Sequence, residues 1–135
     1  MRWCSSTSFA FVLLLIACVP SFRSIVDSPR VAGEMSRENT PTRDVEIWLS
    51  LTGDCKSRST TSRTNKLGRF DFAERRTTLI FETIGDRLHT VDVCTSGSAA
   101  PVSLWSTGWV GSHESIAPYW LRCTGHDCEE VAPLW

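Results

Sequence analysis

The sequence has no surplus of basic residues, and this limits the kinds of partner that the protein can bind. Its 135 residues include 14 Lys and Arg against 15 Asp and Glu, so the formal net charge is −1. Proteins that bind nucleic acid usually carry an excess of positive charge that contacts the phosphates. We therefore expect no nucleic-acid partner. The 41% of hydrophobic residues is typical of a single folded domain rather than of a disordered chain.

The sequence also lacks a hydrophobic run that is long enough to span a membrane. The uncharged apolar run at residues 9–17 has nine residues, whereas a spanning helix needs about 17–25. A short basic region with Arg2 precedes this run, which is the arrangement of a secretory signal peptide. We expect residues 1–17 to be removed and the mature protein to have no transmembrane helix.

The end of the apolar run carries a more specific pattern. Leu15-Ile16-Ala17-Cys18 resembles the bacterial lipobox, in which a small residue precedes a Cys. The resemblance implies that the signal peptide is cleaved before Cys18, that its thiol is diacylated and that the new amino terminus is acylated. The plainer alternative is an ordinary signal peptide that happens to end near a Cys. Two or more acyl chains would anchor the protein stably in a membrane, with residues 18–28 as a tether.

The residue after Cys18 bears on which membrane holds the anchor. Val19 occupies this position, and not Asp. By resemblance to the sorting rules of enterobacteria, this favours the periplasmic face of the outer membrane over the inner membrane.

No motif for catalysis or for a cofactor is found in the sequence. There is no Gly-x-Ser-x-Gly elbow, no Gly-rich phosphate loop and no His-Glu-x-x-His motif. His113 and His126 each precede an acidic residue, but adjacent side chains usually point apart and both pairs lie among turn residues. His89 alternates with Val91 and Val93, which favours a position in a sheet. We expect no catalytic residue, no cofactor and no small-molecule substrate.

Four cysteines remain once the first 18 residues are set aside, and they are Cys55, Cys94, Cys123 and Cys128. An even number in an exported chain indicates two disulfides, with three possible connectivities. We favour Cys55–Cys94 and Cys123–Cys128, since the latter pair encloses a polar turn with a Gly. The alternative is a metal site at Cys123, His126 and Cys128. Zinc sites usually repeat a Cys pair elsewhere in the chain, so we expect no metal.

The middle of the chain alternates with the period of a β-strand. Val45, Ile47, Leu49 and Leu51 alternate with the residues between them, which predicts a half-buried strand whose other face carries Trp48. Further short runs with this pattern lie around residues 60–64, 70–72, 78–82 and 89–94, separated by turn residues. The pattern predicts an all-β, antiparallel sandwich of about seven strands over residues 29–95.

Basic residues gather within this region, between residues 58 and 76. They are Arg58, Arg63, Lys66, Arg69, Arg75 and Arg76. We interpret them mainly as solvated sheet edges that block the addition of a further strand. The alternative is a docking patch for an acidic partner.

The last forty residues, 96–135, are rich in Trp and interrupted by Gly and Pro. We expect an irregular extension, held by the Cys123–Cys128 disulfide and packed on the sandwich. Its aromatic residues either cover an open face of the sandwich or form a surface that binds a partner, because Trp and Tyr dominate interface hot spots. The candidate binding residues are Trp105, Trp109, Tyr119 and Trp120. Gly108 and Gly111 flank Trp109, which favours Trp109 as the exposed residue at a loop tip.

Residues 29–94 resemble the transthyretin-like, carboxypeptidase-regulatory-like sandwich family. The stretches that carry the resemblance are Val31-Ala32-Gly33, the Pro-led run 41–49, the Thr-rich run 60–64 and the turn 65–68, which is followed by Phe-Asp-Phe. The resemblance implies a sandwich that serves as a non-catalytic accessory, adhesive or binding module. Gly68 is expected to adopt a positive φ in the turn.

Together these features predict a non-enzymatic periplasmic lipoprotein that binds another protein. Small lipid-anchored sandwiches of this kind resemble immunity proteins, which cap a toxin delivered to the periplasm, and accessory lipoproteins of secretion systems. The alternative is a structural component of the envelope without a dedicated partner.

The lipid anchor is testable on its own. Replacing Cys18 with Ser removes the thiol that would carry the diacylglyceryl group, so the variant should accumulate as an unprocessed precursor without acyl label. Labelling with a radioactive fatty acid and cell fractionation would measure both effects. A Cys18→Ser variant that still incorporates label and fractionates with the outer membrane would contradict the lipobox.

Overall fold

The computed structural model describes residues 22–80 and 87–133, and every regular element in these ranges is a β-strand. The strands are β1 (Arg23–Ser28), β2 (Val31–Arg37), β3 (Thr40–Pro41), β4 (Glu46–Ser50), β5 (Thr60–Arg63), β6 (Arg69–Phe72), β7 (Arg75–Leu79), β8 (Leu88–Ser96), β9 (Pro101–Val110), β10 (Tyr119–Cys123) and β11 (Cys128–Glu130). The described residues contain no helix able to cross a bilayer. The predicted all-β class is confirmed.

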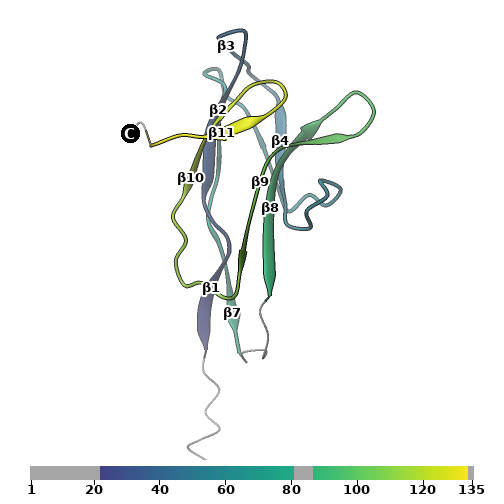
Figure 1. Cartoon of the computed structure of the whole chain (residues 1–135). Coiled ribbons are helices and arrows are strands. Elements are labelled where there is room, and N and C mark those ends of the chain that lie inside the picture. Colours follow the sequence, from purple (N-terminus) through teal and green to yellow (C-terminus); the bar gives the residue numbers. More distant parts are fainter. Residues whose placement is uncertain (1–21, 81–86, 134–135) are drawn as a thin grey trace, which may run out of the picture.

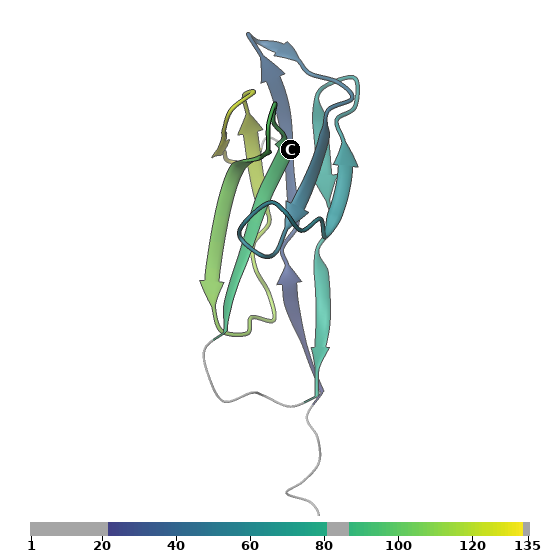
Figure 2. The same cartoon turned by 90° about the vertical axis from the view of Figure 1, so that its right-hand side faces the viewer.

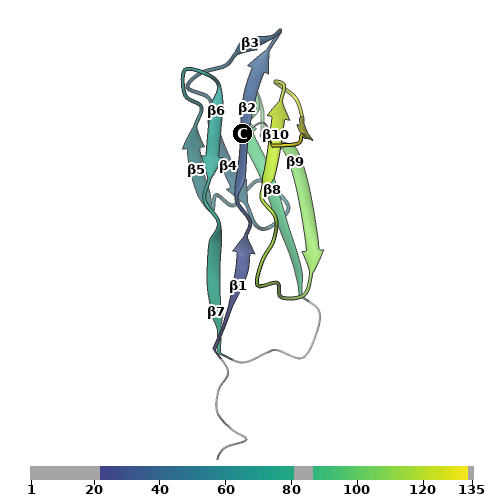
Figure 3. The ribbon, with the colours of Figure 1, turned by 90° about the vertical axis from the view of Figure 1, so that its left-hand side faces the viewer.

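Two sheets form the layers of a sandwich (Figures 1 and 3). The first has the order β11-β10-β2-β3, with β6 paired to the body of β2, and the second has the order β5-β4-β8-β9. Below the first sheet, β1 and β7 form a separate antiparallel pair that continues β2 and β6 downward. Pro29, which has no N–H to donate, lies between β1 and β2 and marks the break. The predicted region contains seven strands, β2 to β8, as expected, and the additional strands β1, β9, β10 and β11 lie before and after it.

The core lies between the two sheets. The first sheet contributes Val31, Met35, Phe70, Phe72, Leu121 and Cys123, and the second contributes Ile47, Leu49, Val91, Val93 and Leu104. On β4 and β6 the core residues recur at every second position, as a strand with one face toward the core requires. The alternation predicted for these strands therefore corresponds to the real core.

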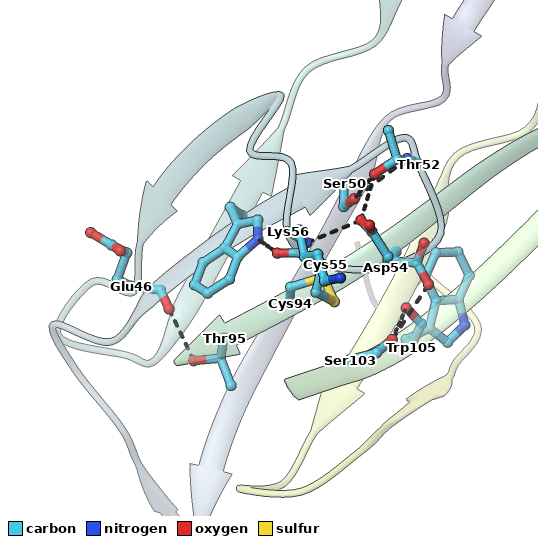
Figure 4. The surroundings of a disulfide bond; sticks show 12 residues. Glu46, Ser50, Thr52, Asp54, Cys55, Lys56, Cys94, Thr95, Ser103 and Trp105 are labelled. Carbon is cyan, nitrogen blue, oxygen red and sulfur yellow. Dashed lines mark hydrogen bonds between the residues drawn. A yellow bond between two sulfur atoms is a disulfide. The ribbon is translucent and has the colours of Figure 1, made fainter. Parts of the chain in front are cut away.

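The outer face of β4 is not solvated, which corrects the prediction of a half-buried strand. Trp48 lies on this face and is fully buried together with Cys55 and Cys94. The segment after β4 folds back over the face and is fixed there by the Cys55–Cys94 disulfide (Figure 4). Trp48 Nε1 donates to the carbonyl of Cys55 at 3.1 Å, and the Arg58 guanidinium lies 4.0 Å from the centre of the indole. The disulfide thus builds a second small core.

The C-terminal third also differs from the prediction, because it is not an irregular extension. β9 is a ten-residue strand of the second sheet, and β10 and β11 belong to the first sheet. β10 pairs with β2 in parallel, with Leu121 opposite Gly33, and the remaining pairs among the described strands are antiparallel. Residues 23–28, expected to be part of a tether, form β1. The sandwich therefore includes segments on both sides of the region 29–95.

The turn between β5 and β6 confirms the expectation for Gly68. The Asn65 side chain accepts hydrogen bonds from the N–H groups of Leu67 and Arg69, at 2.9 and 3.0 Å. Gly68 has a φ of 72°, and a Cβ placed on it would collide with the carbonyl oxygen of Met35. A side chain at this position would face both an unfavourable backbone conformation and a steric conflict with β2.

These two penalties can be separated by comparing Gly68 with Gly111. Gly111 also has a positive φ, of 83°, but an added Cβ would meet no atom within 4 Å. We expect Gly111→Ala to lower the free energy of unfolding by about 1 kcal/mol, the penalty of a left-handed backbone. Gly68→Ala should cost at least about 3 kcal/mol, because the steric conflict is added. Denaturant unfolding measures both, and equal losses would contradict the close approach of the turn to β2.

Candidate protein-binding site

The aromatic residues proposed to bind a partner lie mainly on β9 and β10, and strand geometry decides where they point. β9 follows β8 through a short turn in which Gly97 N–H donates to the carbonyl of Ala100 at 3.1 Å. The register between β8 and β9 shifts at Val93 and Cys94, which pair with Trp105 and Ser103 and leave Leu104 as an extra residue. A bulge of this kind re-aims side chains. As a result Leu104 is buried in the core and Trp105 packs against it.

Trp105 and Tyr119 join the two sheets at one side of the core. Their rings meet with centroids 4.9 Å apart and planes inclined by 59°, a geometry that is favourable for aromatic pairs. Trp105 comes from the second sheet and Tyr119 from the first, and both rings pack against the main core. Their primary role is therefore structural.

Trp109 is not at an exposed loop tip, which corrects the prediction for this residue. It lies within β9, opposite His89 of β8, and its indole stacks on the imidazole with centroids 5.3 Å apart and nearly parallel planes. The flanking Gly108 and Gly111 do not free it, because the strand alternates and turns Trp105, Thr107 and Trp109 inward. His89 is thus a sheet residue, as expected. The ring atoms His89 Nε2 and Trp109 Nε1 are buried without a hydrogen-bond partner among the described residues.

Trp120 lies on the other face of β10, outside the main core. The Arg30 guanidinium is 5.5 Å from the centre of its ring, within the range of a cation–π contact. Arg30 is held there by Asp71, to which it donates two hydrogen bonds of 3.1 and 2.6 Å. The hydrogen bonding and the charge of Asp71 raise the pKa of Arg30 above its already high ordinary value. Of the four proposed residues, Trp120 alone lies on an outer face.

Both predicted disulfides are present. Cys55–Cys94 spans 39 residues of sequence, and Cys123–Cys128 closes a turn in which Thr124 N–H donates to the carbonyl of Asp127 at 2.8 Å. Because the Cys123 and Cys128 sulfurs bond to each other, they do not form the alternative metal site with His126. Cys18, the predicted lipidation site, lies outside the described residues, as does the start of the tether.

The structure also exposes a feature that the sequence analysis did not identify, the outer edge of β9. Among the described strands β9 pairs with β8 alone, and Figure 2 shows its other side at the margin of the molecule. Its ten residues, Pro-Val-Ser-Leu-Trp-Ser-Thr-Gly-Trp-Val, contain no charged side chain. One sequence feature did point to this edge. Residues 101–110 carry no charge, whereas the edge strands β5 and β7 contain Arg.

The other sheet edges are protected in the usual ways. β5, the opposite edge of the same sheet, has four residues and carries Arg63, which pairs with Asp44. β7 carries Arg75 and Arg76, paired with Asp27 and Glu74, and β11 has only three residues. Short length and charge are known means of preventing strand addition, which fits the role predicted for Arg63, Arg75 and Arg76, whereas Arg58 lies over the Trp48 ring. β9 has neither.

Comparisons of this chain with protein-family models, with curated proteins and with solved structures found no match.

Substitution of Trp109 tests its structural role. Trp109→Ala should lower the free energy of unfolding by about 3 kcal/mol, since it removes an indole that packs against the core and stacks on His89. Trp120→Ala, the control on the outer face, should cost about 1 kcal/mol, mainly from the lost contact with Arg30. Thermal and denaturant unfolding measure both. If Trp109→Ala lowers the free energy of unfolding less than Trp120→Ala does, Trp109 is not packed against the core.

Proposed function

We propose that the protein is a non-catalytic, lipid-anchored protein of the periplasm that binds a partner protein along the edge of β9. In this mode an extended segment of the partner pairs with the free backbone groups of β9 and adds a strand to the second sheet. Strand addition is a common form of peptide recognition, in which main-chain hydrogen bonds supply affinity and neighbouring side chains supply specificity. The lipidated Cys18 would hold the protein at the outer membrane.

The observation that carries the proposal is the contrast between β9 and the other edges. A long, uncharged edge strand invites pairing with other chains, and soluble proteins usually avoid it. In the described part of the chain, the edges β5, β7 and β11 are short, charged or both, whereas β9 has ten residues without a charge. An edge left open in a protein that protects its others is best explained by a partner that covers it.

The rest of the fold favours this use of β9. One edge of β9 is paired with β8, and Leu104 packs in the core. Two ring contacts also hold the strand in place, Trp105 with Tyr119 and Trp109 with His89. β8 in turn is linked through Cys94 to the segment that covers Trp48. An edge that is rigid before binding loses little conformational entropy when a partner docks, which favours affinity.

The side chains of the edge indicate what the partner segment should look like. The exposed residues of β9 are Val102, Ser103, Ser106, Gly108 and Val110, with Pro101 at its start. Cross-strand neighbours interact favourably when apolar or hydroxyl side chains face each other. We therefore expect the partner to contribute an extended segment rich in Val, Ile, Thr or Ser and poor in charge.

Two kinds of periplasmic partner fit the proposal. One is a toxin delivered to the periplasm, which the protein would cap as an immunity protein. The other is a component of a secretion system, which it would serve as an accessory lipoprotein. The resemblance to transthyretin-like sandwiches supports a binding role, and the identity of the protein captured at β9 distinguishes the two kinds.

The edge can be tested with a charge placed at its centre. Ser106→Lys puts a positive side chain on the exposed face of β9, where it should weaken pairing with an added strand by at least tenfold. Thr61→Lys adds the same charge to β5, the protected edge of the same sheet, and is the matched control. A photo-crosslinking amino acid at Ser106 or Thr61 in living cells first captures the partner, and the affinity of the purified pair is then measured.

The proposal predicts crosslinks from position 106 and not from position 61, and loss of affinity in Ser106→Lys alone. On formation of the complex, the backbone amides of β9 should become protected from hydrogen exchange. Equal affinity of the Lys variants, or a captured partner whose binding leaves β9 amides unprotected, would contradict strand addition at this edge. A cell in which neither position captures a protein would favour the structural envelope component.

A further inference from the structure

Exposed apolar side chains gather at one end of the sandwich. Of the six large hydrophobic residues that are exposed in the described part of the chain, four belong to this end. They are Phe22, Ile80, Leu88 and Val110, with exposed fractions of 69%, 49%, 67% and 55%. The other two, Leu67 and Val102, lie in the turn before β6 and near the start of β9, at the opposite end. We call the set Phe22, Ile80, Leu88 and Val110 the apolar end.

The four residues belong to one surface because their strands meet there. β1 begins, β7 ends, β8 begins and β9 ends at the same end of the molecule (Figures 2 and 3). Leu88 and Val110 are cross-strand neighbours on β8 and β9. On the other strand pair, Arg23 is paired with Leu79, so the adjacent residues Phe22 and Ile80 lie at the same end of β1 and β7.

The segment after β9 connects the β8–β9 pair to the β1–β7 pair through hydrogen bonds. Val26 N–H donates to the carbonyl of His113 at 2.8 Å, and Gly111 N–H donates to the carbonyl of Arg87 at 2.9 Å. Arg23 and Glu114 form an ion pair of 2.7 Å. The apolar end is therefore a defined part of the fold rather than a set of scattered side chains.

The connection between the proposed lipid anchor at Cys18 and the sandwich joins the sandwich at this end, where β1 begins. Only residues 19–21 separate Phe22 from Cys18. A fully extended chain spans at most about 3.5 Å per residue, so Phe22 lies within about 14 Å of an acylated Cys18. A domain held on so short a connection has its apolar end at the surface of the bilayer.

We propose that the apolar end is a lipid-contacting surface that seats the sandwich on the membrane. This inference rests on the lipid anchor of the proposed function and adds that the domain itself contacts the bilayer. Exposed Phe, Leu, Ile and Val side chains gain free energy when they leave water for the acyl chains. Arg87 stands next to Leu88, and guanidinium groups form strong hydrogen bonds with phosphate, the anionic part of a phospholipid headgroup.

The seating also accounts for the distribution of exposed apolar residues. An apolar end on a freely tumbling protein is an aggregation hazard, whereas the same end under a domain tethered at Phe22 is covered by lipid. A protein partner would have to enter the narrow space between the domain and the bilayer. The short connection to Cys18 therefore favours the bilayer, and not a protein, as the partner that covers the apolar end.

Photo-crosslinking to lipid tests this placement on the full chain in its own membrane. p-Benzoylphenylalanine is introduced singly at Leu88, Val110 or Leu67, so that no new thiol disturbs the disulfides. Leu67 is the matched control, since it is an exposed apolar residue at the opposite end. After irradiation, phospholipid adducts are quantified by mass spectrometry, and acylation of Cys18 is measured on the same samples.

We expect at least tenfold more phospholipid adduct at Leu88 and Val110 than at Leu67. If Cys18 is acylated and the three positions give equal or no adducts, the seating is wrong while the anchor stands. If Cys18 is not acylated and no adducts form, both proposals fail. Adducts confined to Leu88 and Val110 without acylation would support the lipid-contacting surface and overturn the anchor.

Discussion

The parallel pairing of β10 with β2 is the constraint on which the rest of the sandwich depends. It brings residues 119–123 to the middle of the first sheet, where Leu121 faces Gly33 and enters the core. There is no room for a side chain at Gly33, since an added Cβ would lie 2.5 Å from the carbonyl oxygen of Leu121. Because β9 precedes β10, the pairing also sets Trp105 against Tyr119 and closes the side of the core. The C-terminal segment is therefore part of the domain and not an appendage to it.

This arrangement separates the surfaces that the two proposals use. The apolar end lies where β1 and β8 begin, near the connection to Cys18, whereas β9 runs along the side of the molecule and reaches this end only at Val110. A sandwich seated on its apolar end would hold residues 101–109 of β9 away from the bilayer, with their edge uncovered. The 124–127 turn would then face away from the membrane. Anchoring and strand addition along residues 101–109 can thus proceed together, because the two surfaces share only Val110, the last residue of β9.

Local features were predictable from the sequence and long-range pairings were not. The alternation of Ile47 with Leu49, the turn at Gly68 and the Cys123–Cys128 disulfide follow from residue type and spacing over short distances. The Cys55–Cys94 disulfide spans 39 residues and was favoured because these two cysteines remain once the other pair is formed. The burial of Trp48 depends on a segment that folds back over it, and the inward turn of Trp109 depends on its register with His89. No local pattern encodes that β10 joins β2, some ninety residues earlier in the chain. The uncharged run of residues 101–110 can be read from the sequence, but its position at a sheet edge follows only from its pairing with β8 alone among the described strands.

Native-state hydrogen exchange of the free protein tests most directly whether the C-terminal strands belong to the domain. The account predicts that the amides of Leu121 and Cys123 that bond to β2 exchange only through global unfolding, as slowly as those of the central strands β4 and β8. Along β9, amides that bond to β8 should be equally slow, and those that point to the free edge should exchange fast. Exchange of β10 amides through a separate, low-energy opening would contradict this account and make residues 96–133 an extension docked on a smaller sandwich. Uniform protection along β9 would show that its edge is already covered.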